Sequence, residues 1–299
     1  MKSERRSTYA ILVQRTIECI ASRLDEVPEY DALARDAGLS SFQFHRLFAG
    51  MVGETATELA RRLRLERAAW NLANTNTPII DIALDAGFES HEAFTRAFRL
   101  RYDTSPSGFR SRSYPRIELP ARCGVHYSPR GEVPAFIPRQ SGGHMQVDIK
   151  SMPGARLGTV RHIGPYNQIP TAFATLGRTL GPQAGELMQR GSAMMAMYHD
   201  DPETVPLDRL RSDAGVVIPD GMSMPAGLVE QHLAAGQYAC TLHIGPYERI
   251  GDTWARLLGE WLPASGHRMG AGPSYERYLN NPSDVPPEEL RTEICIPLD

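Results

Sequence analysis

One acidic residue near the end of the chain lies in a sequence pattern that suits a charged ligand-binding group. Glu276 lies in a run that alternates as a strand does, which puts Ser274, Glu276 and Tyr278 on one face. A carboxylate on an inward face is costly to bury unless it is paired. We therefore expect that a Glu276 at an empty pocket is available to a cation.

Aromatic residues could strengthen the attraction of such a site for a cation. The rings of Trp254, Tyr278 and Tyr198 are candidates for cation–π contacts. The alternative is structural: the carboxylate pairs with a buried arginine, for example Arg161 or Arg277. Both interpretations stand at this point.

The sequence has no motif of a known catalytic or metal centre. It contains no nucleophile elbow, no metal-ligand cluster and no phosphate-binding loop. The four cysteines, Cys19, Cys123, Cys240 and Cys295, are far apart and form no CxxC pair, so neither a zinc site nor a disulfide framework is indicated. We expect no catalytic residue, no metal and no cofactor, in a reduced, cytoplasmic protein.

Length and composition are those of a globular protein of about two domains. Of 299 residues, 41% are hydrophobic and 22% are charged, and a domain usually has ~100–200 residues. No run approaches the ~18 apolar residues of a membrane helix, and the charged start, Met1–Arg6, leads into no signal segment. We expect no membrane partner. Residues 1–116 carry a net charge of +2 and residues 117–299 one of −5, a basic excess too small by itself to establish nucleic-acid binding.

The first part of the chain repeats a helix-turn-helix pattern. Apolar residues recur at helical spacing from Tyr9 to about Arg112. Residues 34–39 are echoed 49 positions later, and residues 44–48 are echoed 50 positions later. In each copy a short helix ends at a glycine and a serine caps the next helix. A helix, a tight turn and a second helix with a polar outer face is the arrangement that enters a major groove.

The second helix of each copy has an outer face that can recognise bases. The inner stripes, which include Phe44 and Phe94, are expected to face a core. A connecting helix, about Thr55–Asn74, spans ~30 Å, close to the ~34 Å between successive major grooves on one face of a duplex. The outward residues are Phe42, His45, Arg46 and Ala49 in the first copy, and His91, Glu92, Thr95, Arg96 and Arg99 in the second.

A series of ordered motifs covers about residues 8–112. It includes Gly38-Leu39-Ser40, Phe44-His45-Arg46-Leu47-Phe48, Ile82–Ser90, Phe94–Arg99 and Ser105–Arg110. Through these motifs the chain resembles the AraC/XylS family of bacterial transcription regulators, except that Asp103 stands where the family commonly has glycine. The resemblance implies base-edge contacts from Phe42, His45 and Arg46 in the first copy, and from His91, Glu92, Thr95 and Arg96 in the second.

The chemistry of these side chains agrees with base recognition. Arginine can make bidentate contacts to guanine, glutamate can accept from N4 of cytosine, and threonine or phenylalanine can touch a thymine methyl group. Structural alternatives remain, because Arg46 and Arg96 can pair with acidic residues and Phe42 can belong to the packing. Phosphate contacts are expected from Arg61, Arg62, Arg99, Arg101 and Arg110.

The second half of the chain repeats a unit of about 80 residues. His162-Ile163-Gly164-Pro165-Tyr166 recurs letter for letter 81 positions later, and residues 201–206 are echoed 80 positions later. Each copy predicts a strand, the HIGPY turn, a helix, a strand, a proline-rich loop and a strand. His162 and His243 are expected to stabilise the turns. Seams between such units are common places for small-molecule sites.

The two HIGPY turns and residues 261–266, 272–278 and 288–294 resemble the GyrI-like effector-binding domain. In that family the glutamate at the position of Glu276 lies at the floor of an aromatic-lined cavity, where drug-sensing members meet cationic, hydrophobic ligands. The expected ligand site is therefore Glu276 with Tyr278, Trp254 and Tyr198. Some GyrI-like proteins hydrolyse strained small molecules, and in that alternative Glu276 is an acid or base.

Together these features predict a multidomain protein. An all-α tandem helix-turn-helix domain is followed by an α+β domain of two repeated strand-helix-strand-strand units with an antiparallel sheet. The expected boundaries are 1–112 for the DNA-binding domain, 113–144 for a linker and 145–299 for the effector-binding domain. This is the Rob-type order, with the DNA-binding domain first.

The predicted function is sequence-specific regulation of transcription without enzymatic activity. The C-terminal domain is expected to sense a small, hydrophobic and cationic ligand. The expected partners are double-stranded promoter DNA, the effector and, if the protein is an activator, RNA polymerase. The alternatives are a GyrI-like hydrolase fused to a DNA-binding domain, and a DNA-binding protein whose second domain is a scaffold that senses nothing.

Overall fold

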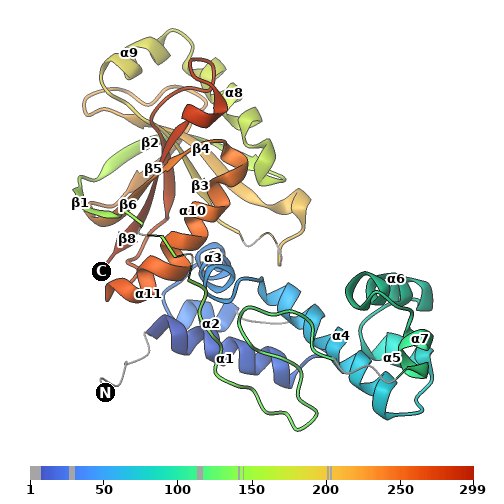
Figure 1. Cartoon of the computed structure of the whole chain (residues 1–299). Coiled ribbons are helices and arrows are strands. Elements are labelled where there is room, and N and C mark those ends of the chain that lie inside the picture. The colour runs from blue at the N-terminus through green and yellow to red at the C-terminus, as the bar shows by residue number, and fades with distance from the viewer. Residues whose placement is uncertain are drawn as a thin grey trace. The chain divides into compact units, whose positions relative to one another are not determined.

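The chain folds into two compact units. The computed structural model describes residues 8–26, 31–112, 117–140, 142–143, 145–200, 202 and 204–299 (Figure 1). Unit 1 consists of residues 1–33 and 48–140, and unit 2 of residues 34–47 and 141–299. The charged start and residues 113–116, 141 and 144 of the expected linker lie outside the described residues. None of the described helices has the length and apolar composition that a membrane crossing needs.

The N-terminal region is helical, as predicted. Two helix-turn-helix pairs, α2 with α3 and α5 with α6, are separated in the chain by the long helix α4. The helices are α1 (Thr8–Ser22), α2 (Asp31–Asp36), α3 (Ser41–Val52), α4 (Ala56–Asn74), α5 (Ile79–Asp85), α6 (His91–Tyr102) and α7 (Pro106–Ser111).

Backbone chemistry at the turns explains where these helices begin and end. Gly38 and Gly87 have φ of 72° and 79°, in the left-handed region that glycine enters without strain. The Ser90 hydroxyl accepts the N–H of Ala93 at 3.1 Å and caps α6. Asp103 ends α6 with φ of 54°, so the position where the related family has glycine keeps the left-handed turn with a different residue.

Residues 117–140 lie across unit 1 and are fastened by a buried carboxylate. Glu66 of α4 is only 1% exposed. It accepts the N–H groups of Leu119 at 3.0 Å and Tyr127 at 2.8 Å, and Nδ1 of His126 lies 3.1 Å away. Because these partners come from one extended segment, Glu66 holds that segment against α4.

Arg62 shares this arrangement and is not a phosphate contact. Its side chain is 9% exposed and its guanidinium pairs with Glu66 at 3.0 Å and Glu54 at 2.6 Å. It also donates to the carbonyl oxygen of Val125 at 2.9 Å. The expectation that Arg62 binds DNA phosphate is wrong, because α4 turns this residue towards the extended segment.

Replacing Glu66 with glutamine is expected to lower the free energy of unfolding by about 3 kcal/mol, since it removes one of the two carboxylates that pair with the buried Arg62 and takes a charged acceptor from the N–H groups of Leu119 and Tyr127. Urea denaturation followed by circular dichroism would measure the loss. Glu118→Gln is a matched control, because it removes an exposed carboxylate from the same segment. Equal unfolding free energies for the two variants would contradict the role assigned to Glu66.

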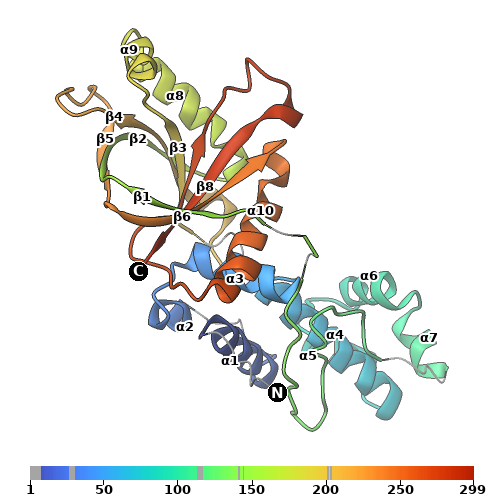
Figure 2. The same ribbon diagram turned by 60° about the vertical axis from the view of Figure 1, so that its left-hand side comes forward.

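Unit 2 contains one antiparallel sheet of eight strands in the order β1-β6-β8-β7-β3-β4-β2-β5 (Figure 2). The first copy of the repeat supplies β1 to β4 and the second β5 to β8, with starting residues 80 or 81 positions apart. The predicted class, an α+β domain of two repeated units with an antiparallel sheet, is confirmed, but each copy has one strand more than predicted, β1 in the first and β5 in the second. The strands are β1 (Asp148–Met152), β2 (Ala155–Ile163), β3 (Met194–Tyr198), β4 (Arg211–Ile218), β5 (Val229–Leu233), β6 (Gly236–Ile244), β7 (Tyr275–Tyr278) and β8 (Arg291–Leu298).

The repeated histidines stabilise the turns that follow β2 and β6, as expected. Nε2 of His162 lies 3.1 Å from the carbonyl oxygen of Pro165, and Nε2 of His243 lies 3.2 Å from that of Pro246. The turns lead to helices α8 (Pro170–Leu180) and α9 (Gln183–Gln189) in the first copy. In the second copy they lead to α10 (Ile250–Arg256) and α11 (Leu262–Ser265), with a π-helical segment, Leu257–Trp261, between them.

Alternation along the central strands gives the sheet two different faces. The residues of β3 that pack with α8 are Met194, Ala196 and Tyr198. Glu276 of β7 is paired in register with Ala196, so it lies on this helix-covered face. The opposite face carries Met195 and Met197 with Leu157, Leu233, Tyr238, Cys240, Tyr275 and Cys295.

Candidate functional site

The second helix-turn-helix pair presents three of its four predicted base contacts to solvent. On α6, His91, Glu92 and Arg96 are exposed and Thr95 is half-buried. Phe94, on the opposite stripe, is fully buried in the core of unit 1. The helix therefore brings the four predicted residues together on one face, where the side chains of Arg96 and Glu92 are accessible.

The remaining predicted phosphate contacts differ in their exposure. Arg61, Arg99 and Arg101 are exposed. Arg110 is half-buried and donates to the carbonyl oxygen of Thr77 at 2.6 Å. The three exposed arginines are thus accessible to solvent, as a contact with DNA phosphate requires.

The first pair places its predicted contacts differently. Phe42 of α3 is 2% exposed, whereas His45 and Arg46 are half-buried. Within unit 2 the Phe42 ring stacks on Tyr198, with centroids 5.6 Å apart, and meets Trp254 edge-on at 5.5 Å. Phe42 belongs to the packing in this structure, beside residues that were predicted to bind a ligand.

The four predicted ligand-site residues meet at the Glu276 carboxylate. Nε1 of Trp254 donates to Oε1 at 2.7 Å, and the hydroxyls of Tyr278 and Tyr198 donate to Oε2 at 3.0 and 3.2 Å. Glu276 is 3% exposed. Burial raises the pKa of Glu276 above its usual value, although the three hydrogen bonds and the charge of Arg46 act in the opposite direction.

The arginines proposed as structural partners of Glu276 pair elsewhere. Nε of Arg161 lies 2.5 Å from Asp213, which stands directly opposite on β4. Nη2 of Arg277 lies 2.6 Å from Glu293. Neither of these two arginines is a partner of Glu276, because adjacent residues of a strand point to opposite faces and Arg277 therefore turns away from Glu276.

Helix α3 adds an aromatic ring and a positive charge to the same cluster. The guanidinium carbon of Arg46 lies 5.3 Å from the centroid of the Phe42 ring. Gln43 donates to the Ser274 hydroxyl at 2.9 Å, and both side chains are buried. The chain itself thus places an apolar ring and a positive charge beside Glu276, and these are the two features expected of a hydrophobic, cationic ligand.

Sequence reasoning missed a second cluster, on the opposite face of the sheet. Cys240 and Cys295 are directly opposite each other on β6 and β8, and Glu293 lies beside them. The spacing rules for cysteine motifs could not find this pair, because a long segment of chain joins the two strands. The useful signal was the repeat, which predicts that the second and last strands of a copy lie in one sheet.

The chain has tandem helix-turn-helix pairs and a duplicated sheet domain that buries a carboxylate among aromatic rings. Together these parts define a DNA-binding transcription regulator that also contains a domain of a small-molecule-binding type. The chain belongs to the GyrI-like family, whose small molecule binding domain matches residues 136–299. A helix-turn-helix domain, of the AraC type that the motifs predicted, matches residues 33–112.

Individual relatives match one half or the other. The regulatory protein SoxS of Salmonella typhimurium is 37% identical over 101 residues, which are 34% of this chain and 94% of SoxS. The HTH-type transcriptional regulator YbfP of Bacillus subtilis is 41% identical over 103 residues, 34% of this chain and 35% of YbfP. A DNA gyrase inhibitor of Serratia proteamaculans is 34% identical over 145 residues, 46% of this chain and 88% of that protein.

Proposed function

We propose that the Glu276 cluster binds a small, hydrophobic organic cation and that DNA binding responds to it. The observation that carries this proposal is the carboxylate itself, which is 3% exposed and hydrogen-bonded to the neutral side chains of Trp254, Tyr278 and Tyr198. A buried negative charge gains most from a positive partner, and aromatic faces attract cations. A ligand with both apolar bulk and positive charge satisfies these demands.

The DNA partner is a promoter read in the major groove. We assign bidentate contact with guanine to Arg96, contact with cytosine to Glu92 and contact with a thymine methyl group to Thr95, with His91 beside them on α6. His45 and Arg46 of α3 read the neighbouring groove together with Phe42. RNA polymerase is a further partner if the protein activates transcription, and the site of action is the cytoplasm.

Helix α3 links the two activities. A ligand that reaches Glu276 takes the place of the Phe42 ring and of the Arg46 charge, which become available to DNA. Such coupling needs only that the ligand binds one arrangement of α3 better than the other. It is reciprocal, so promoter DNA raises the affinity for the ligand by the same factor.

Two probes of matched shape and opposite charge test the proposal. In a Trp70→Phe, Trp261→Phe chain, Trp254 is the remaining tryptophan and its fluorescence reports on the cluster. Tetraphenylphosphonium is expected to change this fluorescence saturably, and tetraphenylborate is expected to leave it unchanged. Equal responses would show that apolar bulk alone drives binding and would overturn the assignment.

A separate measurement on the ligands distinguishes sensing from catalysis. A carboxyl group with a raised pKa suits an acid in hydrolysis, and that property of Glu276 is what favours the hydrolase alternative. The names of SoxS and YbfP favour a role in regulation for the helix-turn-helix part of the chain. Mass spectrometry of candidate ligands after incubation is expected to show unchanged compounds, and a product would establish the alternative.

Truncation of Phe42 is expected to raise the affinity for tetraphenylphosphonium about tenfold, or ~1.4 kcal/mol, because the ligand no longer competes with that ring. Fluorescence titration of Phe42→Ala measures the change. Phe88→Ala is a matched control, because it removes a half-buried ring that packs against Phe94 in unit 1. Weaker binding in Phe42→Ala would mean that the ring is a wall of the site and not a competitor.

A further inference from the structure

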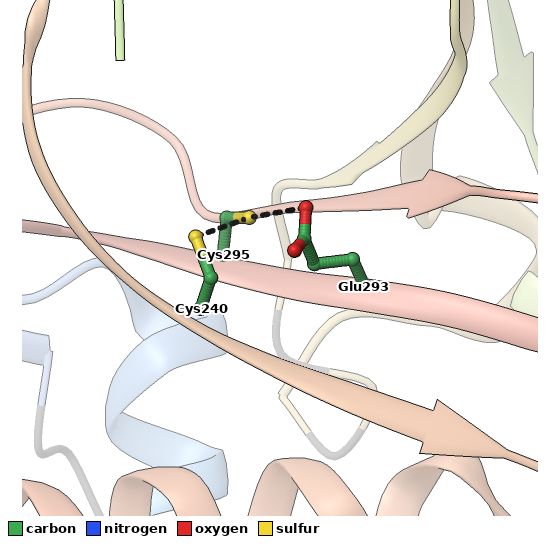
Figure 3. Close-up of side chains that lie close together, drawn as sticks. All are labelled: Cys240, Glu293 and Cys295. Atoms are coloured by element: carbon green, nitrogen blue, oxygen red, sulfur yellow. Dashed lines mark hydrogen bonds between the residues drawn. The ribbon is translucent and has the colours of Figure 1, made fainter. Parts of the chain in front are cut away.

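The sheet face opposite to Glu276 brings two thiols into contact. Cys240 and Cys295 are paired in register on β6 and β8, and their Sγ atoms lie 2.9 Å apart (Figure 3). The two residues are 2% and 0% exposed. A disulfide bond has an S–S length of about 2.0 Å, so a small approach of two strands that are already neighbours suffices to form one.

A fixed pattern of charge surrounds the pair. Oε1 of Glu293 lies 2.5 Å from Nζ of Lys150, and Oε2 lies 2.6 Å from Nη2 of Arg277. The Cys295 thiol lies 3.8 Å from Oε2 of Glu293. Two cations and one carboxylate therefore border the sulfurs, which leaves a net positive surrounding.

The two thiols differ in their readiness to ionise. The hydrogen bond with Cys295 lowers the pKa of the Cys240 thiol, and the charges of Lys150 and Arg277 act in the same direction, against burial and the charge of Glu293. The same hydrogen bond, together with burial, raises the pKa of Cys295. Cys240 is thus the more readily ionised thiol of the pair, and the thiolate is the nucleophile in cysteine chemistry.

Thiol chemistry fits this site better than metal binding does. Cys240, Glu293 and Cys295 are close enough together to ligate one ion. However, both oxygens of Glu293 are bonded to cationic side chains, and these charges would oppose a divalent cation. The same charges stabilise a thiolate.

We propose that Cys240 and Cys295 are a redox modification site, which hydrogen peroxide oxidises to a reversible disulfide between β6 and β8. The Cys240 thiolate attacks one peroxide oxygen; an S–O bond forms, the O–O bond breaks, and the leaving oxygen departs as water after it takes up a proton. Cys295 then attacks the sulfenic sulfur, the S–S bond forms and a second water leaves with the thiol proton. Two thiols and one hydrogen peroxide thus give one disulfide and two waters.

The position of the bond connects it to the strand of Glu276. Cys295 is paired not only with Cys240 but also with Tyr275 of β7, which directly precedes Glu276. The disulfide therefore joins two strands of the sheet next to the strand that carries the carboxylate. The modification itself requires no ligand, so its test does not depend on the proposed sensing function.

Thiol counting on the full chain tests the site. A Cys19→Ser, Cys123→Ser variant keeps only the pair. After hydrogen peroxide treatment and alkylation under denaturing conditions, the intact mass is expected to show no alkylated thiol and the loss of two hydrogen atoms, and dithiothreitol is expected to restore both thiols. Peptide mapping of the wild-type chain is expected to find Cys240 linked to Cys295, so the result does not depend on how the variant folds.

Further variants assign the roles of the two sulfurs and exclude a metal. Cys295→Ser is expected to leave a sulfenic acid at Cys240 that dimedone traps, whereas Cys240→Ser forms none at Cys295. Lys150→Met is expected to slow oxidation at pH 7 several-fold, because a change of one pKa unit alters the thiolate fraction about tenfold. Thiols that stay free under peroxide, or stoichiometric zinc binding that both serine variants abolish, would overturn the proposal.

Discussion

Replacing Glu276 with glutamine is expected to weaken tetraphenylphosphonium binding about 100-fold, or ~2.7 kcal/mol. The variant keeps the shape of the side chain but loses the buried charge that three neutral donors surround. Its amide group also turns a donor towards hydroxyl and indole donors. Fluorescence titration of the Trp254-only chain would measure the loss.

Acidity gives a second measure of the same charge. Burial raises the pKa of Glu276, and only the ionised carboxylate attracts a cation. Affinity is therefore expected to fall as the pH drops through this raised pKa, beginning at a higher pH than for an ordinary glutamate with a pKa of 4.5. The Glu276→Gln chain is expected to bind equally weakly across that range.

Glu230→Gln provides the matched control for charge. Glu230 is exposed on β5 and paired with Arg156 at 2.9 Å, so this variant makes the same change in net charge away from the cluster. It is expected to bind tetraphenylphosphonium as the parent chain does. Equal losses in the two variants, or the same pH dependence with and without Glu276, would disprove the pairing of the ligand with this carboxylate.

Replacing Arg96 with alanine is expected to lower the affinity for the target promoter by about 1–3 kcal/mol, the contribution of a bidentate contact to guanine. Arg96 is exposed on α6 beside Glu92 and Thr95, in the face that would enter the groove. Specificity at the contacted base pair should relax at the same time. Mobility shifts with DNA from upstream of the protein's own gene, and with single-base variants of it, would measure both effects.

Arg99 supplies the contrasting control. It is exposed on the same helix but is expected to hold phosphate, so Arg99→Ala should weaken binding to all sequences alike and reduce the salt dependence. The Arg46→Ala, Arg96→Ala double variant is expected to lose specific binding. Specific binding that survives in the double variant would count against both groove assignments.

The sequence predicted most of the elements because their signals are local. Helical spacing, the serine before α6 and the glycines at positions 38 and 87 act within a few residues of themselves. The two copies of the HIGPY turn likewise identified the repeat, and with it the antiparallel sheet. The residues around Glu276 could also be predicted, because the alternation of β7 and a family resemblance pointed to the same carboxylate.

The remaining features depend on contacts between distant parts of the chain. Arg62 has the spacing of an exposed helix position, yet a segment some 60 residues later covers it and supplies the Val125 carbonyl. Phe42 fits an outward stripe as well as it fits an aromatic cluster. Cys240 and Cys295 meet only because β6 and β8 pair. The periodicity of the sequence cannot predict these three features, because each feature depends on which distant surfaces of the chain pack against each other.

The exchange of first strands between the two copies has a consequence for the symmetry of the site. β1 of the first copy pairs with β6 of the second, and β5 of the second with β2 of the first, so neither copy forms a complete half of the sheet by itself. β4 and β8 are related by an offset of 80 positions in the sequence. The same offset makes Ala196 of the first copy the counterpart of Glu276 in the second, and these two residues are paired with each other between β3 and β7.

Glu276 thus lies on the pseudo-twofold axis, facing its own equivalent. In a dimer of identical copies, any residue at this point would meet itself, and a glutamate there would oppose a second negative charge. Fusion of two copies into one chain removes that constraint, because one position can keep alanine while the other carries the carboxylate. A single charge at the axis, able to take one cation, is an arrangement that the duplicated chain permits and a dimer of identical copies does not.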